Sequence, residues 1–460
     1  MQTLILIACL LVLSSVAYAL GRSRAFAVSD GHSRVLHSRP GYHGMFVALW
    51  CALPALILVM IWIVLEPQIA EWVLIINLPA STQSLSPQEL SLLIIDVKNL
   101  ATGNIVSREI DPALQVAADS YSRMRIIGTA GMAVLAIAIG LAGMTWGRRL
   151  IRQDLRARNQ VERVAHIVMV VASTIAILTT IGIVLSLLFE AARFFAKVPF
   201  FDFLFGLDWS PQTALRADQV GQSGAFGAVP IFAGTLLITV IAMTVAVPIG
   251  LFSAVYMSEY AGPRFRATVK PLLEVLAGVP TVVYGFFAAL TVAPLFRGLG
   301  ESIGLGVSSE SALAAGVVMG IMIIPFVSSL SDDVMNAVPQ TLRDGAYALG
   351  ATKSETIKQV IVPAALPGIV GGVLLAVSRA IGETMIVVMA AGLSANLTAN
   401  PLEAVTTVTV QIVTLLIGDQ EFDSAKTLAA FALGLVLFVA TLALNVIALH
   451  VVRKYREKYD

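Results

Sequence analysis

Long apolar runs alternate with short polar segments along the whole chain. Nine of the runs are long enough to form membrane-spanning helices, which need about 20 mostly apolar residues each. They cover approximately residues 2–20, 45–65, 126–146, 167–189, 230–257, 272–296, 312–331, 366–393 and 427–450. The pattern predicts an all-α integral membrane protein that crosses the membrane about nine times.

The composition agrees with this class. Of the 460 residues, 57% are hydrophobic and only 13% are charged, whereas soluble domains carry about 25% charged residues. The two cysteines lie in apolar runs, and the five histidines show no metal-ligand spacing, so we expect no disulfide framework, metal or cofactor. The net charge of +1 indicates no acidic partner.

The positions of the charges are more informative than their sum. Basic residues gather in the segments 21–40, 148–163, 263–270 and 453–458. The intervening loops at about 66–125, 190–229, 297–311 and 394–426 are mixed or acidic. Because cytoplasmic loops carry the excess of Lys and Arg, this alternation predicts an external N-terminus and a cytoplasmic C-terminus.

We expect two parts in the chain. Residues 1–160 form an N-terminal extension with three spans and a small external subdomain, and residues 161–460 hold six spans. The first run ends in "SVAYA", which resembles a signal-peptidase site. No Lys or Arg precedes that run, as a signal peptide would require, so we predict that residues 1–20 are retained as a helix.

A polar stretch at 332–369 separates the seventh and eighth spans, and its pattern predicts two short cytoplasmic helices. Thr341 is a candidate cap for the first helix. Thr352, followed three residues later by Glu355, is a capping-box pattern for the second. Gly350 between the helices tolerates the positive φ of a tight turn.

The prolines and charges of this stretch lead to two further expectations. Pro363 and Pro367 are expected to end the second helix and to start the next span. The charged side chains are expected to be solvated or to face a soluble partner: Arg343, Asp344, Lys353, Glu355 and Lys358.

The segment "GAYALGATKS" in this stretch has the spacing of a phosphate-binding loop only in part. A Walker A loop needs Gly and Lys directly adjacent so that the lysine reaches the phosphates, whereas Ala351 and Thr352 intervene here. The chain is therefore not expected to bind ATP or to be an enzyme. If ATP drives its function, the ATPase resides in another chain.

The same stretch resembles the cytoplasmic motif of ABC-importer permeases, in which Glu-Ala-Ala, a Gly and a final Pro stand at fixed spacing. Here the motif reads Asp344-Gly345-Ala346, then Gly350, then Val360 to Pro363, with conservative departures at several positions. The resemblance implies a six-helix, type I (MetI-like) permease core. It also implies that coupling helices at 341–362 dock on a dimer of ATPase subunits.

Further stretches narrow the resemblance to one importer. "LLEVLAGVPTVVYGFF" at 272–287 and "SRAIGETM" at 378–385 are similar to the permeases of the phosphate-specific ABC importer, most closely the C-type (PstC) subunit. The A-type subunit shares much of this pattern, and the N-terminal extension is typical of a longer C-type variant. The resemblance implies a bacterial inner-membrane location, an A-type permease as heterodimer partner, a soluble phosphate-binding protein and phosphate as the substrate.

"SRAIGETM" places two charges inside an apolar run. Arg379 and Glu383 are spaced i, i+4, so on one continuous helix they would share a face. One interpretation is an ion pair in the core of the bundle. The other is a contact on an anion path, since charged groups within spans usually mark a pathway and a guanidinium suits two phosphate oxygens. Glu383 would then accept a hydrogen bond from protonated phosphate, and we include Thr384 in this candidate path.

Three alternatives remain open at this stage. A secondary transporter or channel would need no ATPase, but it would not explain the coupling-type loop. A permease for another oxyanion would share most of the features above. A membrane-anchored sensor would need a signalling domain, and the longest soluble stretch is only about residues 66–125.

Overall fold

The structure is a computed structural model that describes residues 2–77, 87–103, 112–213, 223–417 and 423–455. Within these ranges, nine helical segments are long and apolar enough to cross a membrane, which confirms an all-α membrane protein. The chain divides into two compact units, Met1–Leu178 and Thr179–Asp460. The boundary falls inside helix α5 (Ala157–Phe195), downstream of the residue 160 that the sequence indicates.

The first unit is built on three long helices: α1 (Gln2–Val28), α2 (Pro40–Asn77) and α4 (Pro112–Arg149). A single 3₁₀ turn at Ser33–Val35 joins the first two. The helices α2 and α4 pack at very short range, because a Cβ on Gly143 would lie 2.0 Å from the backbone oxygen of Trp50. Small residues at such crossings allow membrane helices to approach closely.

Helix α3 (Pro87–Thr102) packs on the ends of α2 and α4. Its Leu93, Ile94 and Val97 contribute to a buried apolar cluster, and Lys98 donates to Glu71 of α2 at 2.7 Å. The segment 66–125 thus contains a packed helix with its own small core, as its apolar content predicts.

The second unit is a helical bundle that carries a short hairpin. Its elements are, in order, the rest of α5, α6 (Phe200–Phe205), β1 (Trp209–Thr213), β2 (Ser223–Phe226), α7 (Val229–Val255), α8 (Pro263–Ala277), α9 (Thr281–Phe287), α10 (Ala293–Ser302), α11 (Ala312–Asn336), α12 (Gln340–Ala348), α13 (Lys353–Thr356), α14 (Val362–Ile381), α15 (Met385–Ala390), α16 (Val408–Leu416) and α17 (Ala425–Tyr455). Strands β1 and β2 pair antiparallel, with Trp209 opposite Phe226.

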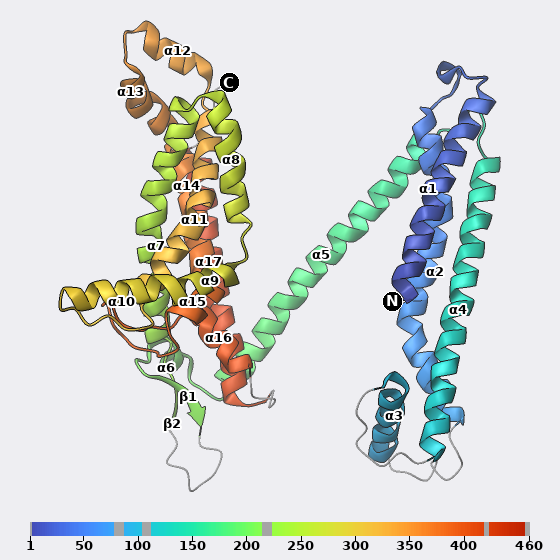
Figure 1. Cartoon of the computed structure of the whole chain (residues 1–460), viewed down its shortest axis with the longest axis horizontal. Coiled ribbons are helices and arrows are strands. Elements are labelled where there is room, and N and C mark those ends of the chain that lie inside the picture. The colour runs from blue at the N-terminus through green and yellow to red at the C-terminus, as the bar shows by residue number, and fades with distance from the viewer. Residues whose placement is uncertain (1, 78–86, 104–111, 214–222, 418–422, 456–460) are drawn as a thin grey trace. The chain divides into compact units, whose positions relative to one another are not determined.

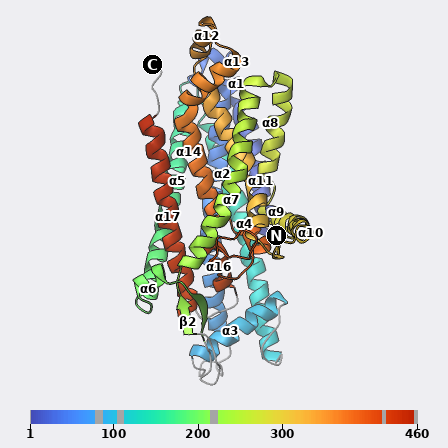
Figure 2. The ribbon, with the colours of Figure 1, turned by 90° about the vertical axis from the view of Figure 1, so that its left-hand side faces the viewer.

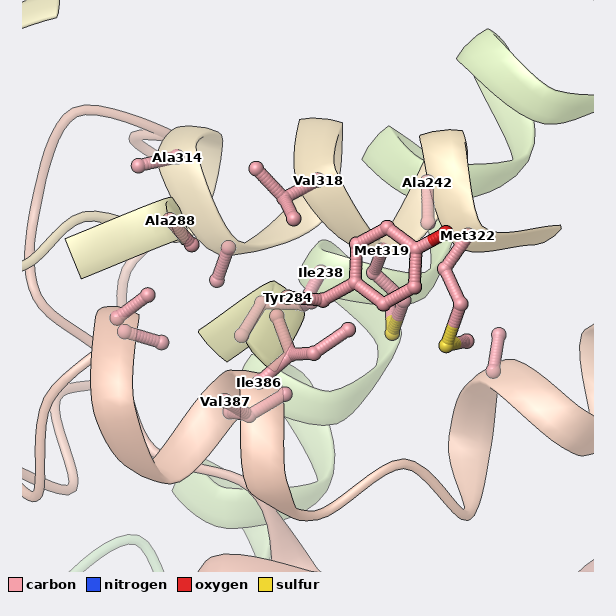
Figure 3. Close-up of a cluster of buried hydrophobic side chains, with 14 of the residues drawn as sticks. Ile238, Ala242, Tyr284, Ala288, Ala314, Val318, Met319, Met322, Ile386 and Val387 are labelled. Carbon is pink, nitrogen blue, oxygen red and sulfur yellow. The ribbon is translucent and has the colours of Figure 1, made fainter. Parts of the chain in front are cut away.

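Helix α11 lies at the centre of this bundle. It packs against α7, α14 and α15 around a core of small and apolar side chains that includes Ile238, Met319 and Ile386 (Figure 3). Ser311 caps its first turn by accepting from the N–H of Ala314 at 3.3 Å. Its central position means that a displacement of α11 must be accommodated by all of its neighbours.

The two ends of the bundle differ. Helices α12 and α13, the start of α8 and the end of α17 lie at one end, and the β1–β2 hairpin with α6 lies at the other (Figure 1). Segments that the charge pattern assigns to the cytoplasm therefore gather at one end of this unit. Which end faces the cytoplasm remains a prediction.

Two expected spans are not single helices. The run 272–296 is interrupted at Gly278–Pro280, where α8 ends and α9 begins. Proline has no N–H and disfavours helical conformation in the residue before it. Helix α10, reached through the π-helix η4 (Ala288–Val292), lies across the bundle axis in both views (Figures 1 and 2). The run 366–393 likewise breaks between Ile381 and Met385.

Candidate functional site

In its second half, the loop between α11 and α14 has the local structure that the sequence predicts. Thr352 Oγ1 accepts from the N–H of Glu355 at 3.4 Å, and Glu355 Oε2 accepts from the N–H of Thr352 at 2.8 Å. Gly350 adopts a φ of +86°, which residues with a Cβ rarely adopt. The capping box and the glycine turn are therefore confirmed.

The start of the first short helix of the loop, α12, differs from the prediction. Pro339 precedes α12, and no side chain caps it, so Thr341 is not the cap. Proline is preorganised for the start of a helix because its φ is fixed and its missing N–H would have no helical partner there. Thr341 instead lies within the first turn and is exposed.

The residues of the motif face outward from α12. Asp344, Gly345 and Gly350 are exposed, and Ala346 is half-buried. The sequence did not single out Leu349, whose side chain is 91% exposed at the tip of the loop. The outward face of the loop therefore carries an apolar side chain next to the turn at Gly350.

Pro363 and Pro367 do not end the second short helix of the loop, contrary to expectation. The chain continues from α13 through the π-helix η5 (Ile357–Ile361) into α14, which contains both prolines. A π-turn is a local widening of the helix, so the missing N–H and the bulk of Pro363 are accommodated without a break. The loop is thereby joined to the eighth span by continuous helix.

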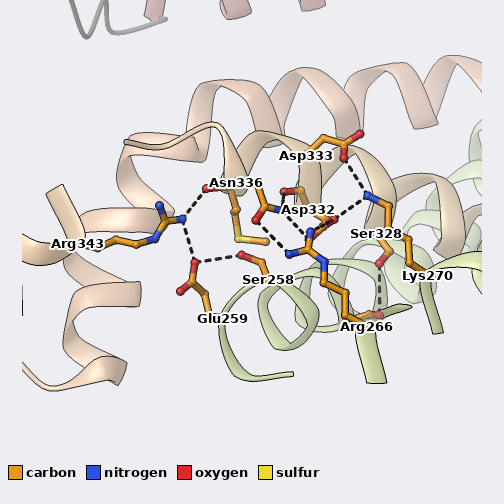
Figure 4. Close-up of polar contacts among 11 residues, drawn as sticks. Ser258, Glu259, Arg266, Lys270, Ser328, Asp332, Asp333, Asn336 and Arg343 are labelled. Atoms are coloured by element: carbon orange, nitrogen blue, oxygen red, sulfur yellow. Dashed lines mark hydrogen bonds and ion pairs between the residues drawn. The ribbon is translucent and has the colours of Figure 1, made fainter. Parts of the chain in front are cut away.

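Arg343 is buried, contrary to the expectation that it is solvated or faces a partner. Its guanidinium donates to the backbone oxygens of Val338 at 2.6 Å and Met335 at 2.9 Å, and to Glu259 Oε1 at 3.1 Å (Figure 4). Glu259 belongs to the π-helix η3 (Tyr256–Tyr260), which ends the span begun by α7. No local sequence pattern indicates this pair, because Arg343 and Glu259 lie 84 positions apart.

Asp332 forms a second ionic contact at the same end of the bundle. Its fully buried carboxylate accepts from Arg266 at 2.8 Å and from Lys270 at 3.0 Å, both on α8 (Figure 4). Asn336 donates to it at 2.9 Å, and the exposed Asp333 lies 3.2 Å from Lys270. The hydrogen bond to Asp332 is the main cause that raises the pKa of Lys270 above its usual 10.5. Asp332 is thus an anchor for α8.

Arg379 and Glu383 are not the ion pair that the spacing predicts. The helix ends at Ile381, so the two residues do not share one helical face. Glu383 Oε1 instead accepts from the backbone N–H groups of Met385 at 3.1 Å and Ile386 at 3.4 Å. Its carboxylate therefore satisfies donors at the start of α15 that have no partner within the helix.

Arg379 lies in the last turn of α14 and is exposed in this single chain. Its guanidinium carbon is 5.8 Å from the ring centroid of Phe326 on α11. Among the residues that the structure describes, no carboxylate pairs with it. The ion-pair interpretation is therefore wrong for this chain, and the cation is held by an aromatic face instead.

Phe326 also lines a pocket of about 230 Å³ between α8 and α11. Glu274, Lys270 and Asp332 line the same pocket, so Glu274 lies beside the ionic contacts of α8. Phe326 therefore lies between this pocket and Arg379.

A layer of hydroxyl groups lies behind the break between α14 and α15. Thr409 Oγ1 donates to the backbone oxygen of Glu383 at 2.8 Å, and Thr407 lies 3.0 Å from Thr409. Thr384, the third predicted pathway residue, is half-buried, and its hydroxyl donates to the backbone oxygen of Gly382 at 3.4 Å. The break is thus fixed from one side by the start of α16.

The start of α16 is also attached to the hairpin. Gln411 Oε1 accepts from the indole N–H of Trp209 on β1 at 2.9 Å. The amide of Gln411 donates to Thr406 at 3.1 Å and to the backbone oxygen of Leu393 at 3.2 Å. Polar contacts therefore link the hairpin end of the bundle to the segment that carries Glu383.

Two family models match the chain. Residues 7–179 match a family described as phosphate ATP-binding cassette transporter, and residues 246–457 match the binding-protein-dependent transport system inner membrane component. The two matches fall in the N-terminal and C-terminal parts of the chain, respectively.

Curated relatives show the same resemblance. The chain is 33% identical over 238 residues to a probable ABC transporter permease protein, YqgH, of Bacillus subtilis, covering 52% of this chain and 73% of the relative. It is 31% identical over 277 residues to the phosphate transport system permease protein PstC 1 of Mycobacterium bovis, covering 55% and 81%. Against PstC of Haemophilus influenzae the identity is 38% over 153 residues, and the chain spans about half of that protein (49%).

Among solved structures, a bacterial alginate ABC transporter in complex with a pentasaccharide-bound periplasmic protein aligns with 66% of this chain and 99% of its own. The sequence identity is 16% and the TM-score is 0.45.

Proposed function

Because this chain belongs to the family of ABC-importer permeases that includes the phosphate transport permeases PstC, we propose that it translocates inorganic phosphate across the bacterial inner membrane. ATP is hydrolysed by a separate ATPase dimer, and a soluble phosphate-binding protein delivers the anion. An A-type permease completes the pore. The observation that carries the proposal is the loop at 340–356, which has one exposed face and one face packed on the spans.

The outward face of that loop supports the ATPase as its partner. Asp344, Gly345 and the 91% exposed Leu349 are available for a contact at the end of the bundle that gathers the basic segments. The motif positions of the permease family coincide with this face. A docked subunit would cover Leu349 and remove its apolar surface from water.

The inward face supports transmission of movement to the spans. Leu342 packs into a cluster with Ala254 of α7, Met335 of α11 and Ile361 and Ala365 of the η5–α14 segment. Close-packed side chains resist compression and pass displacements to their neighbours. A movement of α12 that follows ATP binding would therefore reach three spans and rock the permease between inward-open and outward-open states.

The anion contact rests on Arg379 and Glu383. Arg379 is exposed, stays charged at any relevant pH and presents forked donors that match two phosphate oxygens. Glu383 Oε2 has no hydrogen-bond partner among the described residues, so it is available to accept from a protonated phosphate oxygen. Sulfate lacks that proton at neutral pH, which gives the site a means of discrimination. Thr384 lies beside this contact.

The orientation follows from the same assignment. The loop at 340–356 faces the cytoplasm with the C-terminus, and the hairpin faces outward with the N-terminus. Residues 1–160 are proposed to be a membrane-embedded extension of the permease, retained with its first helix.

Uptake by the reconstituted complex tests the substrate. We expect ATP-dependent uptake of phosphate and none of sulfate or molybdate. Transport of sulfate instead of phosphate would refute the substrate assignment, and flux without an ATPase would refute the importer class.

Variants test the assigned residues. We expect Arg379→Gln, Arg379→Lys and Glu383→Gln to lower uptake at normal protein levels, whereas the exposed Arg264→Gln serves as the matched control. Normal uptake in all three would contradict the anion path. Changing Asp344 or Gly350 should release the ATPase on purification, and retention of the ATPase would contradict the docking surface.

A further inference from the structure

Arg343 is a buried cation on an otherwise exposed helix. Only 11% of its side chain is exposed, although Asp344 and Gly345 beside it face outward. Its acidic partner Glu259 is also buried, with 8% of its side chain exposed. A buried ion pair is often no more stabilising than apolar replacements, so stability alone is a weak reason for its presence.

The contacts of Arg343 join three separate elements. Two of its hydrogen bonds go to backbone oxygens at the end of α11 and just beyond it, on Met335 and Val338. A cation at the C-terminus of a helix satisfies carbonyl groups that have no helical partner. The third goes to Glu259 on η3, whose Oε1 also accepts from Ser258 at 3.1 Å.

Arg343 contacts one span that the chain already joins to α12 and one that it does not. Helix α12 follows α11 after three residues and leads through α13 directly into α14, so both spans are covalently attached to the loop. The α7 span has no such attachment, since Glu259 precedes Arg343 by 84 positions. Within the described ranges, Arg343–Glu259 is the ion pair that joins α12 to the α7 span.

We propose that the Arg343–Glu259 pair is the tether through which movement of the coupling helix α12 is transmitted to the α7 span. This inference rests on the proposed function as an ATP-driven permease. Arg343 is a positioning residue that touches neither phosphate nor ATP. The apolar packing in the same joint transmits compression, but it is non-directional and gives little resistance to sliding or rotation of α12. A charge-assisted hydrogen bond fixes both distance and orientation, so the pair adds directional control to that packing.

The tether predicts a defect in coupling rather than in assembly. Glu259→Gln keeps the shape of the acceptor and removes its charge, and Arg343→Lys keeps the charge and removes the fork. We expect each to lower the phosphate transported per ATP hydrolysed by about tenfold, which corresponds to about 1.4 kcal/mol. A purely structural loss would reduce uptake and hydrolysis together and leave that ratio unchanged.

The experiment uses the full complex in proteoliposomes, with phosphate uptake and ATP hydrolysis measured on the same preparation. The double variant Glu259→Gln/Arg343→Lys should lower the phosphate transported per ATP no further than either single change, because both single changes disrupt the same contact. Arg264→Gln, an exposed arginine at the same end of the bundle, should retain the wild-type ratio. Ser258→Ala removes only the supporting hydroxyl, so it should assemble normally and lower the ratio by a smaller factor.

Unchanged ratios in Glu259→Gln and Arg343→Lys would overturn the tether, as would additive losses in the double variant. If neither variant assembles, an unchanged ratio in Ser258→Ala overturns it. Failure of the proposed function looks different, because the wild-type complex itself would then show no ATP-dependent phosphate uptake.

Discussion

Asp332→Asn should destabilise the second unit far more than the same change at the adjacent Asp333. The Asp332 carboxylate is fully buried and accepts from Arg266 at 2.8 Å, from Lys270 at 3.0 Å and from Asn336 at 2.9 Å. The amide is nearly the same size, but it is neutral and turns a donor toward two cations. The change therefore removes the charge that neutralises Arg266 and Lys270 without creating a cavity.

The magnitude follows from the burial of the three groups. Removing one partner of a buried ion pair lowers the free energy of unfolding by about 3–5 kcal/mol when the remaining charge cannot be solvated. Arg266 and Lys270 each keep 32% of their side chains exposed, so water can partly solvate them and we expect the lower end, about 3 kcal/mol. For a domain of this size, that loss lowers the unfolding midpoint by about 6–12 °C.

The assay is the fraction of detergent-purified chain that stays monodisperse after heating, measured against temperature. Asp333 is the matched control, because its side chain is 64% exposed and pairs with Lys270 at 3.2 Å. Exposed pairs contribute about 0–1 kcal/mol, so Asp333→Asn should shift the midpoint by no more than about 4 °C. Equal shifts in the two variants would refute the assignment of Asp332 as the buried anchor of α8.

Three other predictions use the same heating assay. Glu383→Ala should lower the free energy of unfolding by about 1 kcal/mol, since the start of α15 loses its acceptor; Glu383→Gln keeps an acceptor, and an equal loss there would contradict this reasoning. Trp209→Phe keeps an aromatic ring but loses the bond to Gln411, which should cost about 1 kcal/mol, and an unchanged midpoint would show that the bond does not hold α16. The raised pKa of Lys270 means that its ionic contribution is complete below 10.5 and is lost only as the pH rises through the higher folded-state pKa. The difference in stability between wild type and Lys270→Met should therefore be constant from about pH 6 to 9, and a decline within that range would contradict the direction of the shift.

Features that depend on neighbouring residues could be predicted from the sequence. The apolar runs have the length that a bilayer requires, and the capping box of Thr352 with Glu355 depends on residues three positions apart. Gly350 adopts a positive φ because local geometry demands it. Each of these follows from a few consecutive residues, so the pattern is sufficient.

Features that depend on tertiary contact could not be predicted in this way. Arg266 reaches Asp332 across 66 positions and Arg343 reaches Glu259 across 84, and no local pattern indicates either pair. The i, i+4 spacing of Arg379 and Glu383 was misleading because it presupposes continuous helix. Gly382 between them was the one local signal that the helix ends there.

The π-helices make the orientation of the helices that follow them depend on the number of residues in the chain. In the described part of the chain, η3, η4 and η5 each end two or three residues before a proline, at Pro263, Pro294 and Pro363. A π-turn is in effect one residue inserted into an α-helix, so deleting one residue from η5 would rotate α14 by about 100° relative to α13. The rotation would carry Arg379 away from Phe326 while leaving every remaining side chain chemically intact. The number of residues between the loop and the cation is therefore as much a part of the site as their identity.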